Sequence, residues 1–327
     1  MGAAVEATGE FHIGDRVAAF HRMMTTGGAY AEYAVAPAHT AFTLPKGITF
    51  EGLDHTIRLF VYASISDDFL YFVILEAATI PLVTLTAALA LFRRHSLPPP
   101  WSPRAPNAPP VPLIIYGASS ALGSFAIKLA KAANIHPIIA ICGASQGYVS
   151  GILESSKGDV IVDYRNGVEA MMAAVKEALG PLKVRHALDA ITSKGTWIPV
   201  TQMVDPKDGQ VSVFSGANRY DEAEIPVGVR LTYTYVGTVH SGCYRPGAPK
   251  QPMDAEEVKN DVEFAYVLLR YISRMLARGK FEGHPVEIIP EGLNGVQTGL
   301  RKLKNGEARG VKFVYRIGDT QRLVAQR

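Results

Sequence analysis

Residues 112–133, PLIIYGASSALGSFAIKLAKAA, decide the fold. The apolar, β-branched run at 113–116 predicts a buried strand, and residues 125–133 predict an amphipathic helix. A turn of small residues, 117–123, joins the two. A strand, a small-residue turn and a helix in this order place a pyrophosphate on the N-terminus of the helix. The stretch therefore predicts a dinucleotide-binding unit.

The turn matches the glycine fingerprint of such units loosely. Gly123 keeps the position of the last glycine, while Ala118 and Ser120 take the other two and Gly117 stands one residue earlier. Alanine and serine are still small, and a serine hydroxyl can donate a hydrogen bond to phosphate. An ordinary βα turn without a ligand is the alternative for this turn taken alone.

The next predicted strand, residues 135–142, ends without an acidic residue. An acid at this place would hold the adenine ribose 2′-OH of NAD, so its absence indicates a 2′-phosphate and hence NADPH. Ser145, just beyond the strand, can donate to that phosphate. A further short strand ends in Tyr164 and Arg165, a ring and a cation suited to the same end of the cofactor. For Tyr164 the alternative is a half-buried aromatic residue at a strand end.

The composition of the 327 residues excludes several classes of protein. The net charge is +3 without a basic cluster, which argues against a nucleic-acid partner. No apolar signal core is found near the N-terminus, and no segment predicts a membrane span. The two cysteines, Cys142 and Cys243, exclude a disulfide framework and fit a reducing compartment, so we expect a cytoplasmic protein.

The sequence predicts no metal site. A structural zinc site would need four clustered cysteines, and two isolated ones cannot build it. His21, His39 and His55 lack the spacing of ligands with each other, so we interpret each as a solvated or hydrogen-bonded histidine.

The pattern along the chain predicts an α/β protein with a doubly wound parallel sheet. From residue 113 onward, predicted strands and helices alternate, and further strands follow at 184–191, 209–216 and 231–240. The earlier part predicts strands at 14–20, 27–37 and 42–50 and an apolar helix at 76–92. A long helix is expected at 255–281, followed by a strand, a helix and a closing strand. We expect four regions: 1–95, a proline-rich surface loop at 96–112, the dinucleotide-binding domain at 113–250, and a C-terminal region at 251–327 that returns to the first.

Several separated motifs together resemble one family. They are GDRVAAF, GGAYAEYAVAP, AATIPLVTLTAALALF, YGASSALG, GDVIVDY and LNGVQTGLRKLKNGEARGVKFVYRI, which occur in the family's order and cover most of the chain. The chain resembles the zinc-independent, quinone oxidoreductase-like branch of the medium-chain dehydrogenase/reductases. Within that branch, PPPWSP and SKGDVIVDYR are most similar to the fungal trans-acting enoyl reductases of polyketide biosynthesis.

The resemblance implies a Rossmann domain, a GroES-like β-rich catalytic domain at 1–95, and NADPH-dependent reduction of an activated carbon–carbon double bond. The substrate would be an enoyl thioester of a polyketide on an acyl carrier. The partner would be a polyketide synthase or a synthase–peptide synthetase hybrid.

The resemblance also assigns the sites residue by residue, although it assigns no catalytic residue. It places at the cofactor Ser119, Ser120, Ala121, Leu122, Gly123, Cys142, Gly143, Ala144, Ser145, Tyr164, Gly310 and Val311. It places on the substrate side Thr86, Tyr235, Val236, Gly237, Thr238 and Val239. The alternatives are a helix hydroxyl bonded to its own backbone for Thr86, and a plain core strand for 235–239.

The chain departs from the family pattern at two places. The family carries further strands of the catalytic domain before the GDRV segment, whereas Met1 lies shortly before Gly14, so a truncated catalytic domain is expected. Residues 53–75 interrupt a family-like join and are interpreted as a retained intron or, alternatively, a genuine insertion over the active-site mouth. Besides an enoyl reductase, the sequence leaves open a quinone or enone reductase and an inactive, truncated NADPH-binding paralogue.

Overall fold

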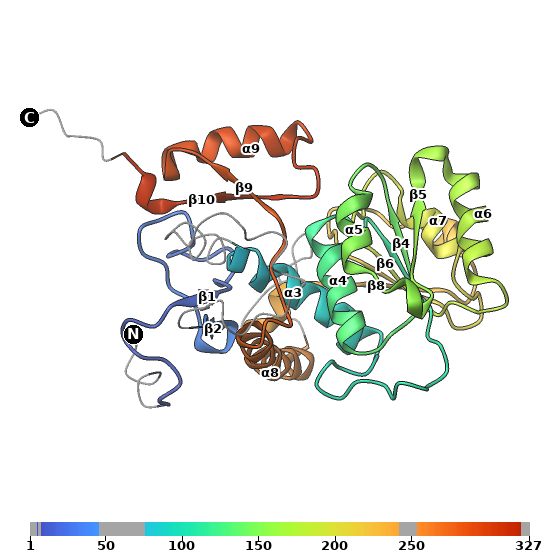
Figure 1. Cartoon of the computed structure of the whole chain (residues 1–327), viewed down its shortest axis with the longest axis horizontal. Helices are drawn as coiled ribbons and strands as arrows, with labels where there is room; N and C mark the ends of the chain where they lie inside the picture. The colour runs from blue at the N-terminus through green and yellow to red at the C-terminus, as the bar shows by residue number, and fades with distance from the viewer. Residues whose placement is uncertain (1–4, 6–7, 46–75, 242–253, 322–327) are drawn as a thin grey trace, which may run out of the picture. The chain divides into compact units, whose positions relative to one another are not determined.

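The structure, a computed structural model, describes residues 5, 8–45, 76–241 and 254–321. The interpretation of residues 53–75 therefore lies outside the described residues. The chain forms two compact units: unit 1 is Met1–Leu82 with Val262–Arg327, and unit 2 is the continuous stretch Val83–Asp261. Figure 1 shows the elements of each.

Unit 2 is built on a six-stranded parallel sheet, which confirms the predicted doubly wound α/β fold. In spatial order its strands are β5 (Val160–Asp163), β4 (Ile138–Cys142), β3 (Leu113–Tyr116), β6 (His186–Asp189), β7 (Gln210–Val213) and β8 (Arg230–Tyr233). The chain fills the sheet outward from β3, first toward β5 and then, from β6 on, toward β8. The point where this direction reverses, between β3 and β6, is where α/β sheets of this kind bind ligands.

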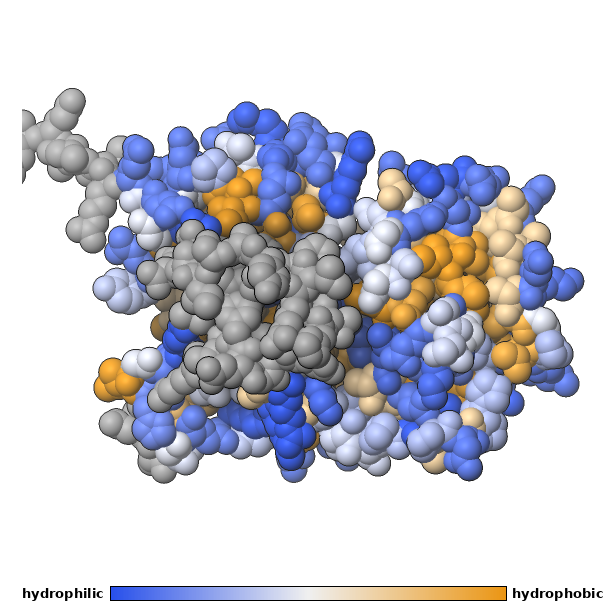
Figure 2. Space-filling model, in the orientation of Figure 1, coloured by the Kyte–Doolittle hydropathy of each residue, from blue (hydrophilic) through white to orange (hydrophobic). Residues whose placement is uncertain are grey.

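Helices cover the sheet because its central strands are apolar on both faces. The helices of unit 2 are α4 (Ala121–Ala132), α5 (Gln146–Ile152), α6 (Val168–Leu179), α7 (Trp197–Gln202) and the end of α3 (Ile80–Ala88), which continues as the π-helix η4 (Leu89–Arg94). One buried cluster joins Ile114 and Ile141 of the sheet to Val175 of α6 and Trp197 of α7. At the sheet edge, β5 leaves Val160 and Ile161 half-buried, and Figure 2 shows apolar side chains gathered over this part of unit 2.

In the described residues of unit 1, the strands form two small sheets, and α8 (Ala255–Ala277) and α9 (Val296–Lys304) accompany them. Strands β1 (Val17–Ala19) and β2 (Ala41–Thr43) pair antiparallel, and β9 (Val286–Ile289) pairs parallel with β10 (Lys312–Tyr315). Unit 1 holds α9 and most of α8, whose first turns belong to unit 2. No helix in the described ranges is both long and apolar enough to cross a membrane.

Two predicted strands are wrong. Residues 27–37 form no strand: Tyr33 and Val35 are 87% and 73% exposed, so the alternating pattern there covers no core. The strand predicted at 231–240 ends at Tyr233, because the backbone then coils into the short 3-10 helix η8 (Val236–Val239). The sequence also missed α7, a single short helix that contains Pro199.

Candidate functional site

The turn between β3 and α4 is fixed by its backbone. The amides of Gly117 and Ala118 both donate to the carbonyl oxygen of Ile141 on β4, at 2.9 and 3.0 Å. Gly117 has a φ of +77°, a conformation that residues with a Cβ rarely adopt. The turn is therefore tied to the neighbouring strand just beyond the carboxyl end of the sheet.

Gly123 lets α4 approach this turn closely. A Cβ on Gly123 would lie 2.3 Å from the Gly117 carbonyl oxygen and 2.7 Å from the Ala118 Cα, both backbone atoms. Ser120 caps the helix, since its Oγ accepts a hydrogen bond from the Gly123 amide at 3.0 Å. The last glycine of the loose fingerprint thus serves helix–strand packing, as the sequence predicted.

A phosphate fits at this helix start. The amides of Ala121 and Leu122 lie in the first turn of α4, where backbone N–H groups have no intrahelical acceptor. Both residues are half-buried, as are Ser119 and Ser120 ahead of them. The positive end of the helix dipole adds to the attraction for an anion. The predicted cofactor residues Ser119, Ser120, Ala121, Leu122 and Gly123 therefore lie together in a cradle suited to a pyrophosphate.

A loop that the sequence analysis missed packs against the same turn. Asp189, the last residue of β6, is buried, and its carboxylate accepts from the amides of Ile191 and Thr192 at 3.1 and 2.9 Å and from Thr196 Oγ1 at 2.6 Å. These bonds hold the loop so that Ile191 covers Gly117, where an added Cβ would meet the isoleucine side chain at 2.6 Å. Burial raises the pKa of Asp189. An acidic residue at the end of an apolar strand was the feature of the sequence that could have indicated this loop.

The predicted adenosine side gathers at the ends of β4 and β5. The Tyr164 hydroxyl lies over Gly143, 2.9 Å from where a Cβ on that glycine would stand. The Tyr164 ring also lies 5.9 Å from the ring of Tyr116. Cys142 is buried, and burial raises the pKa of its thiol to about 11, so the thiol stays protonated at neutral pH. Ala144 is exposed and Ser145 is half-buried ahead of α5.

One acidic residue, Asp163, does lie near the predicted adenosine side, but its negative charge is paired with Arg165. Asp163 closes β5 opposite Cys142 in register and accepts from Arg165 Nη2 at 2.6 Å and from Gln146 Nε2 at 2.8 Å. The side-chain hydrogen bonds from Arg165 lower the pKa of Asp163 to about 2, and those with Asp163 raise the pKa of Arg165. The sequence pattern indicated Arg165, but it did not indicate that the Asp163 carboxylate orients this arginine.

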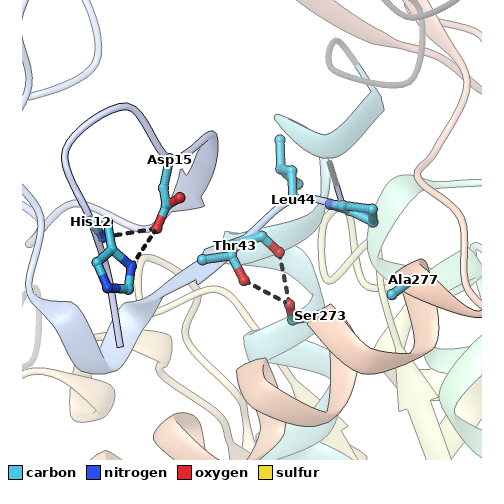
Figure 3. Close-up of a pocket in the computed structure, with 7 residues that line it drawn as sticks. His12, Asp15, Thr43, Leu44, Ser273 and Ala277 are labelled. Atoms are coloured by element: carbon cyan, nitrogen blue, oxygen red, sulfur yellow. Dashed lines mark hydrogen bonds and ion pairs between the residues drawn. The ribbon is translucent and has the colours of Figure 1, made fainter. Parts of the chain in front are cut away.

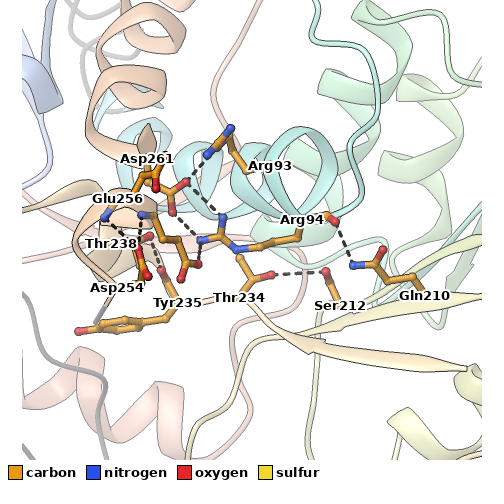
Figure 4. Close-up of polar contacts among 11 residues, drawn as sticks. Arg93, Arg94, Gln210, Ser212, Thr234, Tyr235, Thr238, Asp254, Glu256 and Asp261 are labelled. Carbon is orange, nitrogen blue, oxygen red and sulfur yellow. Dashed lines mark hydrogen bonds and ion pairs between the residues drawn. The ribbon is translucent and has the colours of Figure 1, made fainter. Parts of the chain in front are cut away.

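The predicted substrate-side residues are buried. Thr86 lies on α3, and η8 supplies the other segment, in which Thr238 Oγ1 donates to the Tyr235 carbonyl oxygen at 2.9 Å (Figure 4). The Tyr235 ring stacks on that of Tyr233 at 6.3 Å. A substrate role for Thr86 and for Tyr235, Val236, Gly237, Thr238 and Val239 stays a prediction, as does a cofactor role for Gly310 and Val311, which precede β10 in unit 1.

Two polar clusters are formed by residues that the sequence did not predict as site residues. In unit 2, buried Asp261 accepts from Arg93 Nε at 3.0 Å and from both terminal nitrogens of Arg94 (Figure 4). Also in unit 2, His95 bridges His186 and Ser212, its Nδ1 lying 3.1 Å from the Nδ1 of His186 and its Nε2 lying 2.9 Å from the serine Oγ. Both clusters are internally bonded and fit a structural role.

A small pocket of about 330 Å³ lies in unit 1, between β2 and α8 (Figure 3). Its polar groups bond to one another: Ser273 Oγ donates to the Thr43 carbonyl oxygen at 2.7 Å, and the His12 amide donates to Asp15 at 2.8 Å. None of the predicted site residues lines it. Among the described residues, no group of three or more His, Cys, Asp or Glu side chains can hold a metal ion.

No protein-family model matches the chain. Curated relatives do. The chain is 35% identical over 285 residues to the trans-enoyl reductase fsr4 of Gibberella fujikuroi, which covers 87% of this chain and 71% of the relative. It is 25% identical to the trans-enoyl reductase FSL5 of Gibberella zeae over 97% of this chain and 79% of the relative.

Solved structures share the fold at low sequence identity. An NAD-dependent alcohol dehydrogenase matches with a TM-score of 0.58 at 17% identity, over 88% of this chain and 66% of the other. Mycobacterial Rv1454c, solved with NADPH, matches with a TM-score of 0.57 at 16% identity, over 96% and 78%. At these identities the two structures confirm the expected fold alone. The chain belongs to the trans-enoyl reductase family of the medium-chain dehydrogenase/reductases and is an oxidoreductase of that family.

Proposed function

We propose that this chain is an NADPH-dependent enoyl reductase that acts in trans on a polyketide enoyl thioester carried by a separate synthase. The observation that carries the proposal is the similarity to the trans-enoyl reductase of Gibberella fujikuroi over 87% of the chain, together with the intact phosphate cradle at Gly117–Gly123. NADPH, when bound, would supply the hydride that adds to the β-carbon of the double bond, and a proton would complete the α-carbon. The products are the saturated thioester and NADP⁺.

The residues of the cradle would bind and orient the cofactor. The amides of Ala121 and Leu122 and the hydroxyls of Ser119 and Ser120 are the donors available to the pyrophosphate. Ile191, held by Asp189, would exclude water from the face of the turn. Rigid donors of this kind are effective because the protein pays no reorganisation when the ligand binds.

The preference for NADPH rests on charge. The end of β4 offers no carboxylate to the ribose 2′-OH, and the one nearby carboxylate, Asp163, is held by Arg165. An exposed guanidinium, 54% accessible, can still share its remaining N–H groups with a 2′-phosphate. The Tyr164 hydroxyl supplies a further donor beside Gly143.

The substrate-side assignment follows the family resemblance. We propose that Thr86 faces the nicotinamide and that the segment 235–239 lines the acyl pocket. The Thr238 hydroxyl of η8 bonds to the Tyr235 carbonyl oxygen, and the Tyr235 ring just before η8 stacks on Tyr233, which suits a wall of fixed shape.

The proposal can be tested by two titrations followed by turnover. We expect the protein to bind NADPH more tightly than NADH, and Arg165→Ala to weaken NADPH about tenfold while changing NADH little, because the variant leaves Asp163 beside the 2′-phosphate. Lys157→Ala, an exposed lysine of the same unit, is the matched control.

Turnover then separates the possible reactions. Reduction of crotonyl-pantetheine with NADPH supports the proposal. Turnover of a simple quinone but not of the enoyl thioester would replace it with quinone reduction, and a failure to bind either nucleotide would leave the protein without the proposed activity.

A further inference from the structure

Unit 2 has a second open surface, beside the amino ends of β6 and β7 and away from the cofactor cradle. It is an open groove of about 560 Å³ between the end of α6 and the end of α7. We call it the α6–α7 groove; it is lined by Met172, Ala173, Val175, Lys176, Leu179, Gly180, Leu182, Lys183, Val184, Gln202, Met203, Val204, Asp205, Pro206 and Lys207.

The floor of the groove is apolar. Val175, Leu179, Val184 and Val204 are each less than a tenth exposed and belong to the core cluster under the sheet. Met203 is half-buried at the wall, and methionine adapts its shape to different partners. Core side chains thus form the bottom of the groove, and the half-buried Met172, Leu182 and Met203 supply apolar surface that stays accessible.

The rim of the groove is basic. Lys176, Lys183 and Lys207 are all exposed, and the single lining acid, Asp205, is already bonded to Lys183 Nζ at 3.2 Å and to the Lys207 amide at 3.0 Å. Those bonds lower the pKa of Asp205, the Lys207 amide most of all. Neither Lys176 nor Lys207 forms an ion pair within the part of the chain that the structure describes.

We propose that the α6–α7 groove docks an acidic amphipathic helix of another protein. An apolar stripe on such a helix would cover the floor, and its carboxylates would meet Lys176 and Lys207. A second copy of the chain is disfavoured, because a two-fold contact would set the same lysines against each other. A small ligand is disfavoured because exposed Ala173, Gly180 and Pro206 leave the groove open along its length.

The groove lies where a bound partner would not obstruct the cofactor cradle. Val184 and Val204 lie just before β6 and β7, so the groove is at the amino ends of strands whose carboxyl ends lead to the cofactor loops. Four-residue strands separate the two edges by about 13 Å. A helix docked in the groove would hold the reductase while the cofactor cradle stays open. If the proposed function is correct, the partner is the synthase that carries the substrate. The acidic and apolar character of the docked helix is inferred from the groove alone and does not rest on the proposed function.

The test uses the full chain and a labelled helical peptide of about 15 residues, or roughly four turns. The peptide carries leucines at i, i+3, i+4 and i+7, glutamates beside them and alanines elsewhere; a twin has lysine for every glutamate. We expect the glutamate peptide to bind at low salt, and Lys176→Glu with Lys207→Glu to weaken it at least tenfold. The lysine peptide should gain affinity for the same double variant. Lys157→Glu, outside the groove, should change neither.

The opposite results overturn the inference. They are no binding of the glutamate peptide, equal weakening by Lys157→Glu, or a dimer of the free protein that the double variant dissociates. NADPH binding and thioester reduction are measured on the same samples. A protein that reduces the thioester but ignores the peptide disproves the groove alone. One that binds the peptide through the lysines but reduces nothing disproves the proposed function alone.

Discussion

Replacing Gly123 with alanine tests whether the tight packing of α4 on the β3 turn is what builds the cofactor site. The new Cβ would stand 2.3 Å from the Gly117 carbonyl oxygen, where ordinary contact begins at 3.4 Å, so helix and turn must separate by about 1 Å. Both clashing partners are backbone atoms, which cannot turn aside as a side chain can. Overpacking of this kind destabilises a protein by about 1–3 kcal/mol.

The same shift would carry the Ala121 and Leu122 amides away from the pyrophosphate. A hydrogen bond to a charged group contributes about 1.5–3 kcal/mol, so losing one weakens NADPH at least tenfold. Stability is measured by urea unfolding followed through tryptophan fluorescence, because Trp101 and Trp197 both lie in unit 2. NADPH affinity is measured by titration of the same samples.

Gly151→Ala is the matched control for Gly123→Ala. Gly151 lies in α5, an added Cβ there meets nothing within 4 Å, and alanine is the better helix former by about 1 kcal/mol. We expect Gly151→Ala to keep NADPH affinity and to hold or raise stability. If Gly123→Ala instead behaves like Gly151→Ala in both measurements, the close approach of α4 to the turn does not build the site.

Three further predictions concern the buried polar groups of unit 2. Burial lowers the folded-state pKa of His95 and of His186, so as pH falls below about 6.5 the unfolded chain takes up their protons at a higher pH than the folded protein does. Stability should then fall by up to about 1.4 kcal/mol per pH unit for each histidine, and urea unfolding at several pH values should show a shallower fall for His186→Asn; parallel curves would contradict this. Asp159→Ala should destabilise by about 3 kcal/mol, because it strips two backbone amides and the His136 ring of their acceptor; a loss below 1 kcal/mol in urea unfolding would count against it. Asp261→Ala should destabilise by about 3–5 kcal/mol, since it leaves the arginines of η4 without their buried partner, and an unchanged unfolding midpoint would refute that role.

The parallel sheet of unit 2 could be predicted because its strands are short apolar runs that the sequence separates by helices. Leu113, Ile114 and Ile115 are fully buried, as their pattern indicated. Alternation alone failed at 27–37, since a pattern of period two does not show that a partner strand exists. It failed again after Tyr233, where the turn into η8 depends on the packing of Gly237 against the Tyr235 ring.

The part of the candidate site that a single short segment forms, the turn at Ser119–Gly123, could be predicted from the sequence. It was not predictable where segments distant in sequence meet. The cover that Ile191 gives to Gly117 depends on β6 lying next to β3. The negative charge of Asp163 at the end of β5 is balanced only because Arg165 and Gln146 both bond to this carboxylate. Such convergence is a property of the sheet order, which no local pattern encodes.

The division of the chain between the two units sets an order of folding. Unit 2 is one uninterrupted stretch, so its residues are all available once synthesis has passed Asp261. Unit 1 joins segments from opposite ends of the sequence: Ser273 bonds to Thr43, and the His284 amide bonds to Thr79. On the ribosome, the first segment must therefore wait until the whole of unit 2 has emerged, and β1 and β2 spend that interval without α8. Closing so long a loop is far easier when the intervening chain is already compact, so the dinucleotide-binding unit acts as the folding scaffold for the unit that encloses it in sequence.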